Sequence, residues 1–158
     1  MARELITTWS DYQAAIDRLL AIASQKMCIY DEDLGQLKLE SATRLNELKR
    51  VMHGSHQEAL RIALRNAMLL RRDHPKLCTL LSTYSHQAMA QQTPEQIAHL
   101  RDSMILVDGR HALIRFDRDQ ARSKLLIDEA DELRPYLTRF EEIWAEGGEP
   151  VSSTTLGL

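Results

Sequence analysis

Short apolar runs alternate with amphipathic segments along most of the chain. From Asp11 onward, apolar residues recur at the spacing of one helical face, and they are Tyr12, Ile16, Leu19, Leu20 and Ala23. This spacing predicts a helix that buries one side and that Ser10 caps. Residues 6–9 before it are β-prone. The short apolar run at residues 26–30 after it predicts a strand.

Helices and strands continue to alternate through the middle of the chain. Ser41 is expected to open a helix over residues 41–52, which Gly54 ends. Residues 59–64 predict the next strand, and Pro75 at a first helical position predicts another helix.

The last part of the chain contains the clearest helix. A weak strand is expected at residues 87–91, followed by a capping box at residues 93–96. Two strands joined by a glycine turn are expected within residues 101–114, and residues 124–127 predict one more strand. The final helix, residues 129–145, carries apolar residues at helical steps, namely Leu133, Leu137, Phe140 and Trp144.

This order of elements predicts an α/β fold with a mixed β-sheet flanked by helices. Residues 1–146 are expected to form one domain. Residues 147–158 begin with Gly-Gly-Glu-Pro and continue with serine and threonine, and we expect them to form a flexible C-terminal tail.

Composition limits the classes of function. The 158 residues are 44% apolar and 27% charged, as in soluble globular domains. The formal charge of −3 gives no overall attraction to nucleic acid or to an anionic membrane. No apolar run is long enough to span a membrane, and the N-terminus lacks the apolar segment of a secretory signal. We therefore expect a cytoplasmic protein with no membrane partner.

The cysteines and histidines predict neither a metal site nor a bound cofactor. Cys28 and Cys78 lie in apolar segments and are expected to be buried, reduced thiols. His53 and His56 are close in sequence but lack a third ligand nearby. A glycine loop of the kind that cradles nucleotide phosphates is absent from the sequence.

Residues 101–114 read Arg-Asp-Ser-Met-Ile-Leu-Val-Asp-Gly-Arg-His-Ala-Leu-Ile. Together with the order of elements over residues 26–145, this segment resembles the signature region of one half of a phospholipase D-like domain. Active members of that superfamily carry His-x-Lys, four residues and then Asp, usually followed by Gly. Placing Asp108 on that aspartate puts Arg101 at the histidine and Ser103 at the lysine.

The resemblance implies a site that has lost its chemistry. The family reaction needs an imidazole nucleophile and a lysine that offsets charge on the phosphoryl oxygens. Arg101 stays protonated and cannot act as a nucleophile, and Ser103 supplies no cation. Phosphodiesterase chemistry is therefore expected to be absent. Asp108 is expected to pair with Arg101 or to hold the turn at Gly109.

Two histidines leave an enzymatic alternative open. His99 precedes Arg101 in a His-x-Arg pattern, and a bulge in the strand would bring its side chain to the site. A phosphodiesterase-like or nuclease-like enzyme with a remodelled site would use His99 or His111 together with Arg101 and Asp108.

A cluster of basic residues between the second and third predicted helices is a candidate binding surface. Its members are Arg61, Arg65, Arg71, Arg72, His74 and Lys76. Such a patch would make the chain a nucleic-acid-binding module. Against this, an aromatic content of 5% leaves few platforms on which bases stack.

Charged residues near the degenerate motif are a second candidate surface. Arg115 and Arg118 stand about where the family carries small residues and an asparagine that help to hold phosphate. Asp117 and Asp119 alternate with them, which indicates salt bridging or contact with a partner. The acidic residues 31–33 follow a predicted strand, where α/β folds place ligand sites, but a solvated turn is the favoured interpretation.

The leading hypothesis is a non-catalytic phospholipase D-like module that acts as a binding, regulatory or scaffold protein. Active halves build their site across a two-fold interface, so the resemblance implies a homodimer. A phosphate-containing ligand and nucleic acid are the alternative partners.

Overall fold

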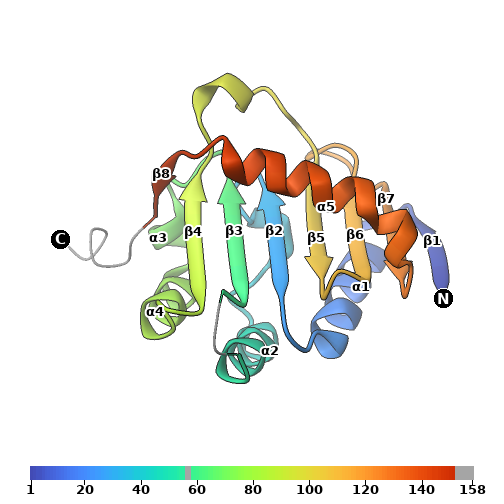
Figure 1. The fold of residues 1–158 in the computed structure, drawn as a ribbon, viewed down its shortest axis with the longest axis horizontal. Coiled ribbons are helices and arrows are strands. Elements are labelled where there is room, and N and C mark those ends of the chain that lie inside the picture. The colour runs from blue at the N-terminus through green and yellow to red at the C-terminus, as the bar shows by residue number, and fades with distance from the viewer. Residues whose placement is uncertain (56–57, 152–158) are drawn as a thin grey trace.

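The computed structural model describes residues 1–55 and 58–151, which form a mixed β-sheet with helices on both faces (Figure 1). The strands are β1 (Ala2–Ile6), β2 (Met27–Asp31), β3 (Leu60–Leu64), β4 (Ala88–Gln92), β5 (Ser103–Val107), β6 (His111–Arg115), β7 (Ser123–Ile127) and β8 (Glu149–Pro150). The α-helices are α1 (Trp9–Ile22), α2 (Ala42–His53), α3 (Leu70–Asp73), α4 (Pro75–Thr83) and α5 (Ala130–Ala145). Two 3-10 turns lie at Gly35–Leu37 and Glu95–Ile97.

The strands of the described residues follow the order β1-β7-β6-β5-β2-β3-β4-β8. β2, β3 and β4 are parallel, whereas β5 runs antiparallel to β2 and continues into β6 and β7 as an antiparallel meander. The carboxyl ends of β2, β3 and β6 therefore meet the amino end of β5. We call this the upper rim of the sheet, at the top in Figure 1, and the opposite strand ends the lower rim.

Each face of the sheet has its own core, because alternate side chains of a strand point to opposite faces. In β2, Met27 and Ile29 belong to the core with α1, α2 and α4, whereas Cys28 and Tyr30 belong to the core under α5. α5 crosses this second face (Figure 1). It buries three side chains there: Leu133, Phe140 and Ile143. Each fully buried apolar side chain of this size stabilises the fold by about 1.5–3 kcal/mol.

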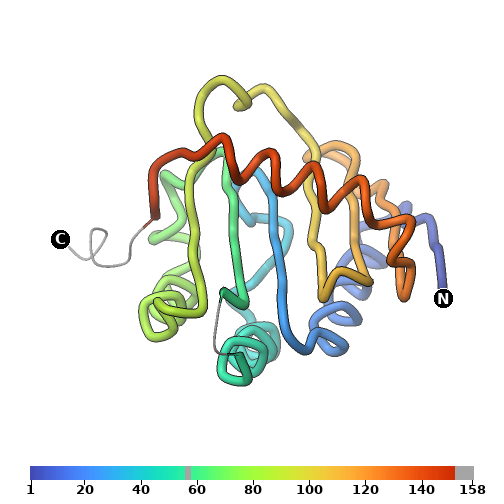
Figure 2. Tube along the Cα trace, in the orientation of Figure 1, coloured from blue at the N-terminus to red at the C-terminus, as the bar shows by residue number. Residues whose placement is uncertain are grey.

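The outermost strands come from the two ends of the described chain. β1 lies beside β7 at one side of the sheet, and β8 lies beside β4 at the other, so the N-terminus and the C-terminal segment are far apart (Figure 2). Within the described residues, no helix combines the length and the apolar character that crossing a membrane requires.

The predicted fold class, an α/β fold with a mixed sheet flanked by helices, is confirmed. The predicted strands at residues 26–30, 59–64 and 124–127 correspond to β2, β3 and β7. Ser41 caps α2 as predicted, since its hydroxyl oxygen accepts the Arg44 N–H at 3.2 Å. These elements share strong local signals, either hydrophobic runs of strand length or a cap followed by a helical stripe.

Two predicted helix caps are wrong. α1 begins at Trp9, and Thr8 rather than Ser10 accepts the Asp11 N–H, at 3.1 Å. The predicted capping box yields a single 3-10 turn, and the Thr93 hydroxyl has no hydrogen-bond partner among the described residues. In both places, side-chain type alone does not fix the residue at which the backbone turns.

α3 and β8 have no predicted counterpart, because elements this short carry no periodicity. Glu149–Pro150 lies in the predicted flexible tail, yet it pairs with Gln91 and Gln92 of β4. Gly148, at a φ of +130°, permits this close approach, because a Cβ there would overlap the Gln92 carbonyl group. The rest of the predicted tail, residues 152–158, lies outside the described residues.

Candidate functional site

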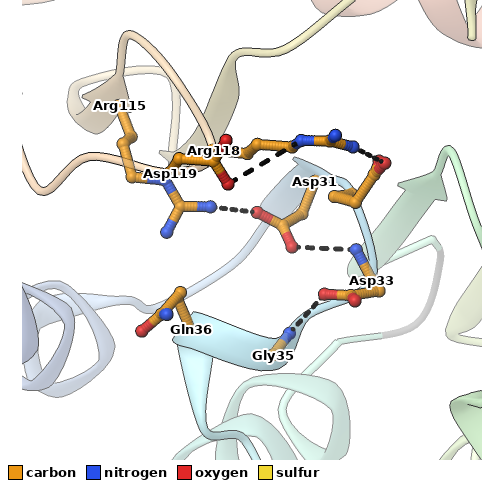
Figure 3. A pocket seen from close by; sticks show the side chains of 8 residues that line it. Asp31, Asp33, Gly35, Gln36, Arg115, Arg118 and Asp119 are labelled. Carbon is orange, nitrogen blue, oxygen red and sulfur yellow. Dashed lines mark hydrogen bonds and ion pairs between the residues drawn. The ribbon is translucent and has the colours of Figure 1, made fainter.

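One buried carboxylate joins four segments at the upper rim. Asp31 is the last residue of β2 and is 1% exposed. Its Oδ1 accepts a hydrogen bond from the Ser103 hydroxyl. The same oxygen accepts a hydrogen bond from Arg115 Nη2 at 2.8 Å (Figure 3). Its Oδ2 accepts the backbone N–H groups of Asp33, at 3.2 Å, and Leu34, at 2.7 Å. Asp31 thus links β2, β5, β6 and the loop that follows β2. We call Asp31, Ser103 and Arg115 the Asp31 cluster.

Arg115 is the cation of this cluster and is also buried. Its Nη2 donates to the Ser103 hydroxyl at 3.0 Å as well as to Asp31. Its guanidinium carbon lies 5.5 Å from the centre of the Trp9 ring and 5.0 Å from that of Tyr12. Burial raises the pKa of Tyr12 well above its usual value, so this phenol stays neutral. Arg115 Nε and Nη1 have no hydrogen-bond partner among the described residues.

Ion pairs surround this cluster along the upper rim. Glu32 accepts hydrogen bonds from Arg65 Nε at 3.2 Å and from Arg118 Nη1 at 2.5 Å. Arg101 donates to Asp117 at 2.6 Å and to Asp119 at 2.5 Å. The cations of the rim are therefore engaged by neighbouring carboxylates, as the alternation of charges in the sequence predicts.

A cavity of about 320 Å³ opens beside Asp31 (Figure 3), and we call it the rim cavity. Its lining residues are Asp31, Glu32, Asp33, Gly35, Gln36, Arg115, Arg118 and Asp119. Four of them carry a carboxylate and two a guanidinium, and no described histidine or cysteine lines the cavity. The cavity therefore offers hydrogen-bond donors and acceptors but no nucleophile of the imidazole or thiol type.

The structure separates the residues of the degenerate motif. Ser103 lies in the Asp31 cluster, where Asp31 and Arg115 use its hydroxyl. Arg101 lies on the surface beside its aspartates. Asp108 follows β5 at the lower rim, so the expected pairing of Asp108 with Arg101 is wrong. The five-residue strand between them carries the two side chains to opposite rims.

Asp108 instead fastens a turn, which was the other expectation for it. Asp108 and Gly109 begin the three-residue loop between β5 and β6, and their φ values of 55° and 67° form a turn in which the Arg110 N–H donates to the Val107 carbonyl oxygen at 3.0 Å. The Asp108 carboxylate accepts the backbone N–H groups of Ser24, Gln25 and Lys26 at 2.8–2.9 Å. Burial opposes its ionisation, but these hydrogen bonds outweigh burial and lower the pKa of Asp108.

The two histidines of the enzymatic alternative lie away from the rim cavity. His99 is exposed in the turn after Glu95–Ile97, and β5 starts only at Ser103, so the described backbone contains no bulge that carries His99 onto the strand. His111 begins β6 at the lower rim, and its Nδ1 accepts the Asp128 N–H at 2.9 Å. Burial lowers the pKa of His111.

The predicted basic patch is not a continuous surface. Arg61 points beneath α5, pairs with Glu141 and lies 5.1 Å and 5.4 Å from the centres of the Phe140 and Trp144 rings. Arg65 is buried against Glu32. Strand alternation turns Arg61 toward the face that α5 covers. The Arg65 guanidinium carbon lies 4.9 Å from the centre of the Tyr30 ring of β2. Three predicted binding residues stay exposed: Arg71, Arg72 and Lys76.

The cysteines agree with their prediction. Cys28 and Cys78 are free and buried, and burial raises the pKa of both thiols. Among the described residues, no group of three or more histidine, cysteine or acidic side chains is placed to hold a metal ion.

Sequence reasoning missed the importance of Asp31. The interpretation of residues 31–33 as a solvated turn is wrong for Asp31, which is buried, and holds only for exposed Asp33. Asp31 also has a local role. Leu34 is buried and has a φ of 68°, and Asp31 stabilises the turn there by accepting the Leu34 N–H. The partners Ser103 and Arg115, however, are 72 and 84 residues away in sequence.

One protein-family model matches most of the chain. The model of a domain of unknown function, DUF7931, matches residues 8–153. The chain belongs to this family. No curated protein matches the chain.

Solved structures share the fold of this DUF7931 domain. It is similar to TrmBL2, described as an archaeal chromatin protein with a novel mode of DNA binding, at 13% identity and a TM-score of 0.69 over 96% of this chain and 55% of TrmBL2. It thus spans about half of TrmBL2. Nuc from Salmonella typhimurium, a phospholipase D family member, matches at 11% identity and a TM-score of 0.63 over 96% of this chain and 98% of Nuc.

NucT from Helicobacter pylori matches at 9% identity and a TM-score of 0.56, again over 96% of this chain and 98% of NucT. At such identities the likeness is one of fold. The phospholipase D-like fold that the sequence predicts is therefore confirmed.

Replacing Asp31 tests the Asp31 cluster. Asp31→Asn leaves the Arg115 guanidinium buried without its counter-charge, so we expect a loss of about 3–5 kcal/mol in the free energy of unfolding. Urea denaturation monitored by circular dichroism measures this. Asp117→Asn is the matched control, because it breaks the exposed pair with Arg101 and is expected to cost far less. Equal losses in the two variants would contradict the role of Asp31.

Proposed function

We propose that this chain is a non-catalytic module of phospholipase D-like fold that works by binding. One observation supports the proposal: the Ser103 hydroxyl and the Arg115 guanidinium both donate hydrogen bonds to the buried Asp31 carboxylate. Ser103 stands at the position of the family's lysine. Ser103 is 2% exposed, and its hydroxyl forms hydrogen bonds with Asp31 and Arg115 inside the protein.

The groups that the family reaction needs are not assembled at the upper rim. Arg101, at the position of the nucleophile, stays protonated and is held by Asp117 and Asp119. None of the histidines among the described residues lines the rim cavity. Without an imidazole, no phospho-histidine intermediate forms and no side chain there shuttles a proton near neutral pH.

A turnover assay tests the absence of catalysis. With bis(p-nitrophenyl) phosphate as a generic diester, we expect no release of nitrophenol above the buffer rate. His99→Ala is the matched variant, because His99 is exposed and its loss leaves the Asp31 cluster intact. Turnover in the wild type that disappears in His99→Ala would establish the remodelled enzyme and overturn the proposal.

The same proposal includes a homodimer. The likeness to Nuc and NucT extends over 96% of this chain and 98% of each of theirs, so the three chains share the fold over a similar length. Active halves of the superfamily build their site across a two-fold axis, and closed two-fold pairs are the commonest assembly of identical chains.

Sedimentation equilibrium at increasing protein concentration tests the pairing. We expect the fitted mass to reach twice that of the monomer and then to stay constant, because a closed two-fold interface leaves no free surface for further growth. A monomer mass at every concentration would remove the homodimer.

A nucleic-acid-binding module is the second candidate, favoured by the likeness to the DNA-binding protein TrmBL2. Arg71 and Lys76 supply the cations, since both are exposed and neither forms an ion pair within the described part of the chain. The burial of Arg61 and Arg65 and the net charge of −3 weaken this candidate.

Binding of a fluorescent DNA duplex at two salt concentrations separates the candidates. If Arg71 and Lys76 contact phosphates, the double variant Arg71→Ala/Lys76→Ala lowers the salt dependence of the affinity by about two, one per contact. Arg110→Ala, which changes an exposed arginine at the lower rim, is the control. We expect the wild type to show no salt-dependent binding, and a slope that the double variant alone reduces would favour the nucleic-acid module.

A further inference from the structure

Three exposed carboxylates lie without a counter-charge at the end of α5 and in β8. Glu142 and Glu146 are four residues apart at the C-terminal end of α5, and Glu149 begins β8. None of the three forms an ion pair with another described residue. We call them the outer acidic cluster.

The helix itself disfavours carboxylates at this position. The C-terminal end of a helix carries a partial negative charge, which repels anions and attracts cations. α5 nevertheless has no basic residue in its last turn. Glu142 and Glu146 also repel one another, because residues four apart lie on the same side of a helix. The stability of α5 therefore does not account for the outer acidic cluster, whereas a cation from another molecule would relieve both repulsions.

Two cations without a carboxylate partner lie on the other face of the sheet. Arg71 of α3 and Lys76 of α4 are exposed and form no ion pair within the described residues, and we call them the outer basic cluster. Both helices pack against the face of the sheet opposite α5. Met68 and Leu69, which come just before α3, are exposed apolar side chains. This surface thus combines positive charge with apolar groups.

Gln92 at the end of β4 links the two clusters. Its backbone pairs with Glu149 of β8, and its side-chain oxygen accepts the N–H of Ala67, three residues before α3, at 2.9 Å. The end of α5 lies against the same strand, because Gln91 Nε2 donates to the Trp144 carbonyl oxygen at 3.0 Å. The end of α5, β8 and α3 lie together at the left in Figure 1. The two clusters therefore flank one side of the sheet from opposite faces.

We infer that two copies of this chain pair through the β8 side of the sheet, with the outer acidic cluster of each copy against the outer basic cluster of the other. The inference rests on the proposed homodimer and names the surface that forms it. A two-fold axis parallel to the strands exchanges the two faces of the sheet. It therefore brings the α5 face of one copy beside the α3–α4 face of its partner, and it forms each contact twice. An axis perpendicular to the sheet would instead bring like charges together.

The upper rim offers no comparable attraction between two copies. Its exposed cations already pair with carboxylates of the same chain, Arg118 with Glu32 and Arg101 with Asp117 and Asp119. Complementary charges direct association most strongly where each copy leaves them unpaired. Within the described residues, the β8 side has such charges of both signs.

Reversing one cluster at a time tests this interface. Arg71→Glu/Lys76→Glu makes both clusters acidic, and Glu142→Lys/Glu146→Lys makes both mainly basic. We expect the homodimer dissociation constant of each variant, measured by sedimentation equilibrium, to be at least about tenfold above that of the wild type. The reason is that each reversal turns attraction into repulsion at both copies of the contact.

Mixing the two reversed variants in equal amounts is the decisive experiment. Every contact between the two clusters is then again between opposite charges, so we expect a heterodimer close to the wild-type affinity. Arg110→Glu/Arg134→Glu is the matched control, because it makes the same change in charge at exposed sites in the β5–β6 loop and the first half of α5. We expect this control to form the homodimer as the wild type does. Circular dichroism checks that each variant is folded.

Three results would overturn the inference. A wild-type homodimer that both reversals leave intact would keep the proposed pairing but exclude the β8 side. Reversed variants that stay monomeric when mixed, although the wild type dimerises, would exclude the pairing of the two clusters. A wild type that is monomeric at every concentration would instead remove the homodimer of the proposed function, and this interface with it.

Discussion

The upper rim depends on the charge of Asp31. A carboxylate that is 1% exposed is costly to bury unless its oxygens are fully hydrogen-bonded and its charge is compensated. Asp31 meets both conditions with groups from β5, β6 and its own loop. The requirement works in the other direction too, because Arg115 is buried and, among the described residues, pairs with no other carboxylate. The loop conformation, the Ser103 hydroxyl and the Arg115 side chain are therefore fixed together.

This constraint also explains how the residue at one motif position, Ser103, is used in the fold. In active members of the family that the sequence resembles, the segment that corresponds to Arg101–Ser103 supplies both the nucleophile and the cation. Here the cation is Arg115 on the neighbouring strand, and it forms a buried ion pair with Asp31. The replacement leaves a rim rich in paired charges and a small polar cavity beside it.

The sequence predicts the parts of the structure that local pattern determines. Residues 129–145 repeat apolar positions at helical steps, and α5 buries the expected face. The Asp31 cluster escapes prediction because its partners are 72 and 84 residues distant, and no local pattern reports such pairing. The basic patch fails for a related reason. Arg61 and Arg71 are close in the chain, but strand alternation and the aromatic residues of α5 bury Arg61 alone.

Asp108 shows why part of the motif is present without its chemistry. Five residues of β5 separate its two ends, so Ser103 serves the upper rim and Asp108 the lower. Asp108 adopts a left-handed conformation in the hairpin turn, and its carboxylate accepts hydrogen bonds from the backbone N–H groups of the three residues just before β2. These contacts place β2 beside β5, which in turn sets Asp31 opposite Ser103. The Asp-Gly pair is therefore needed for the register of the sheet whether or not the upper rim catalyses a reaction.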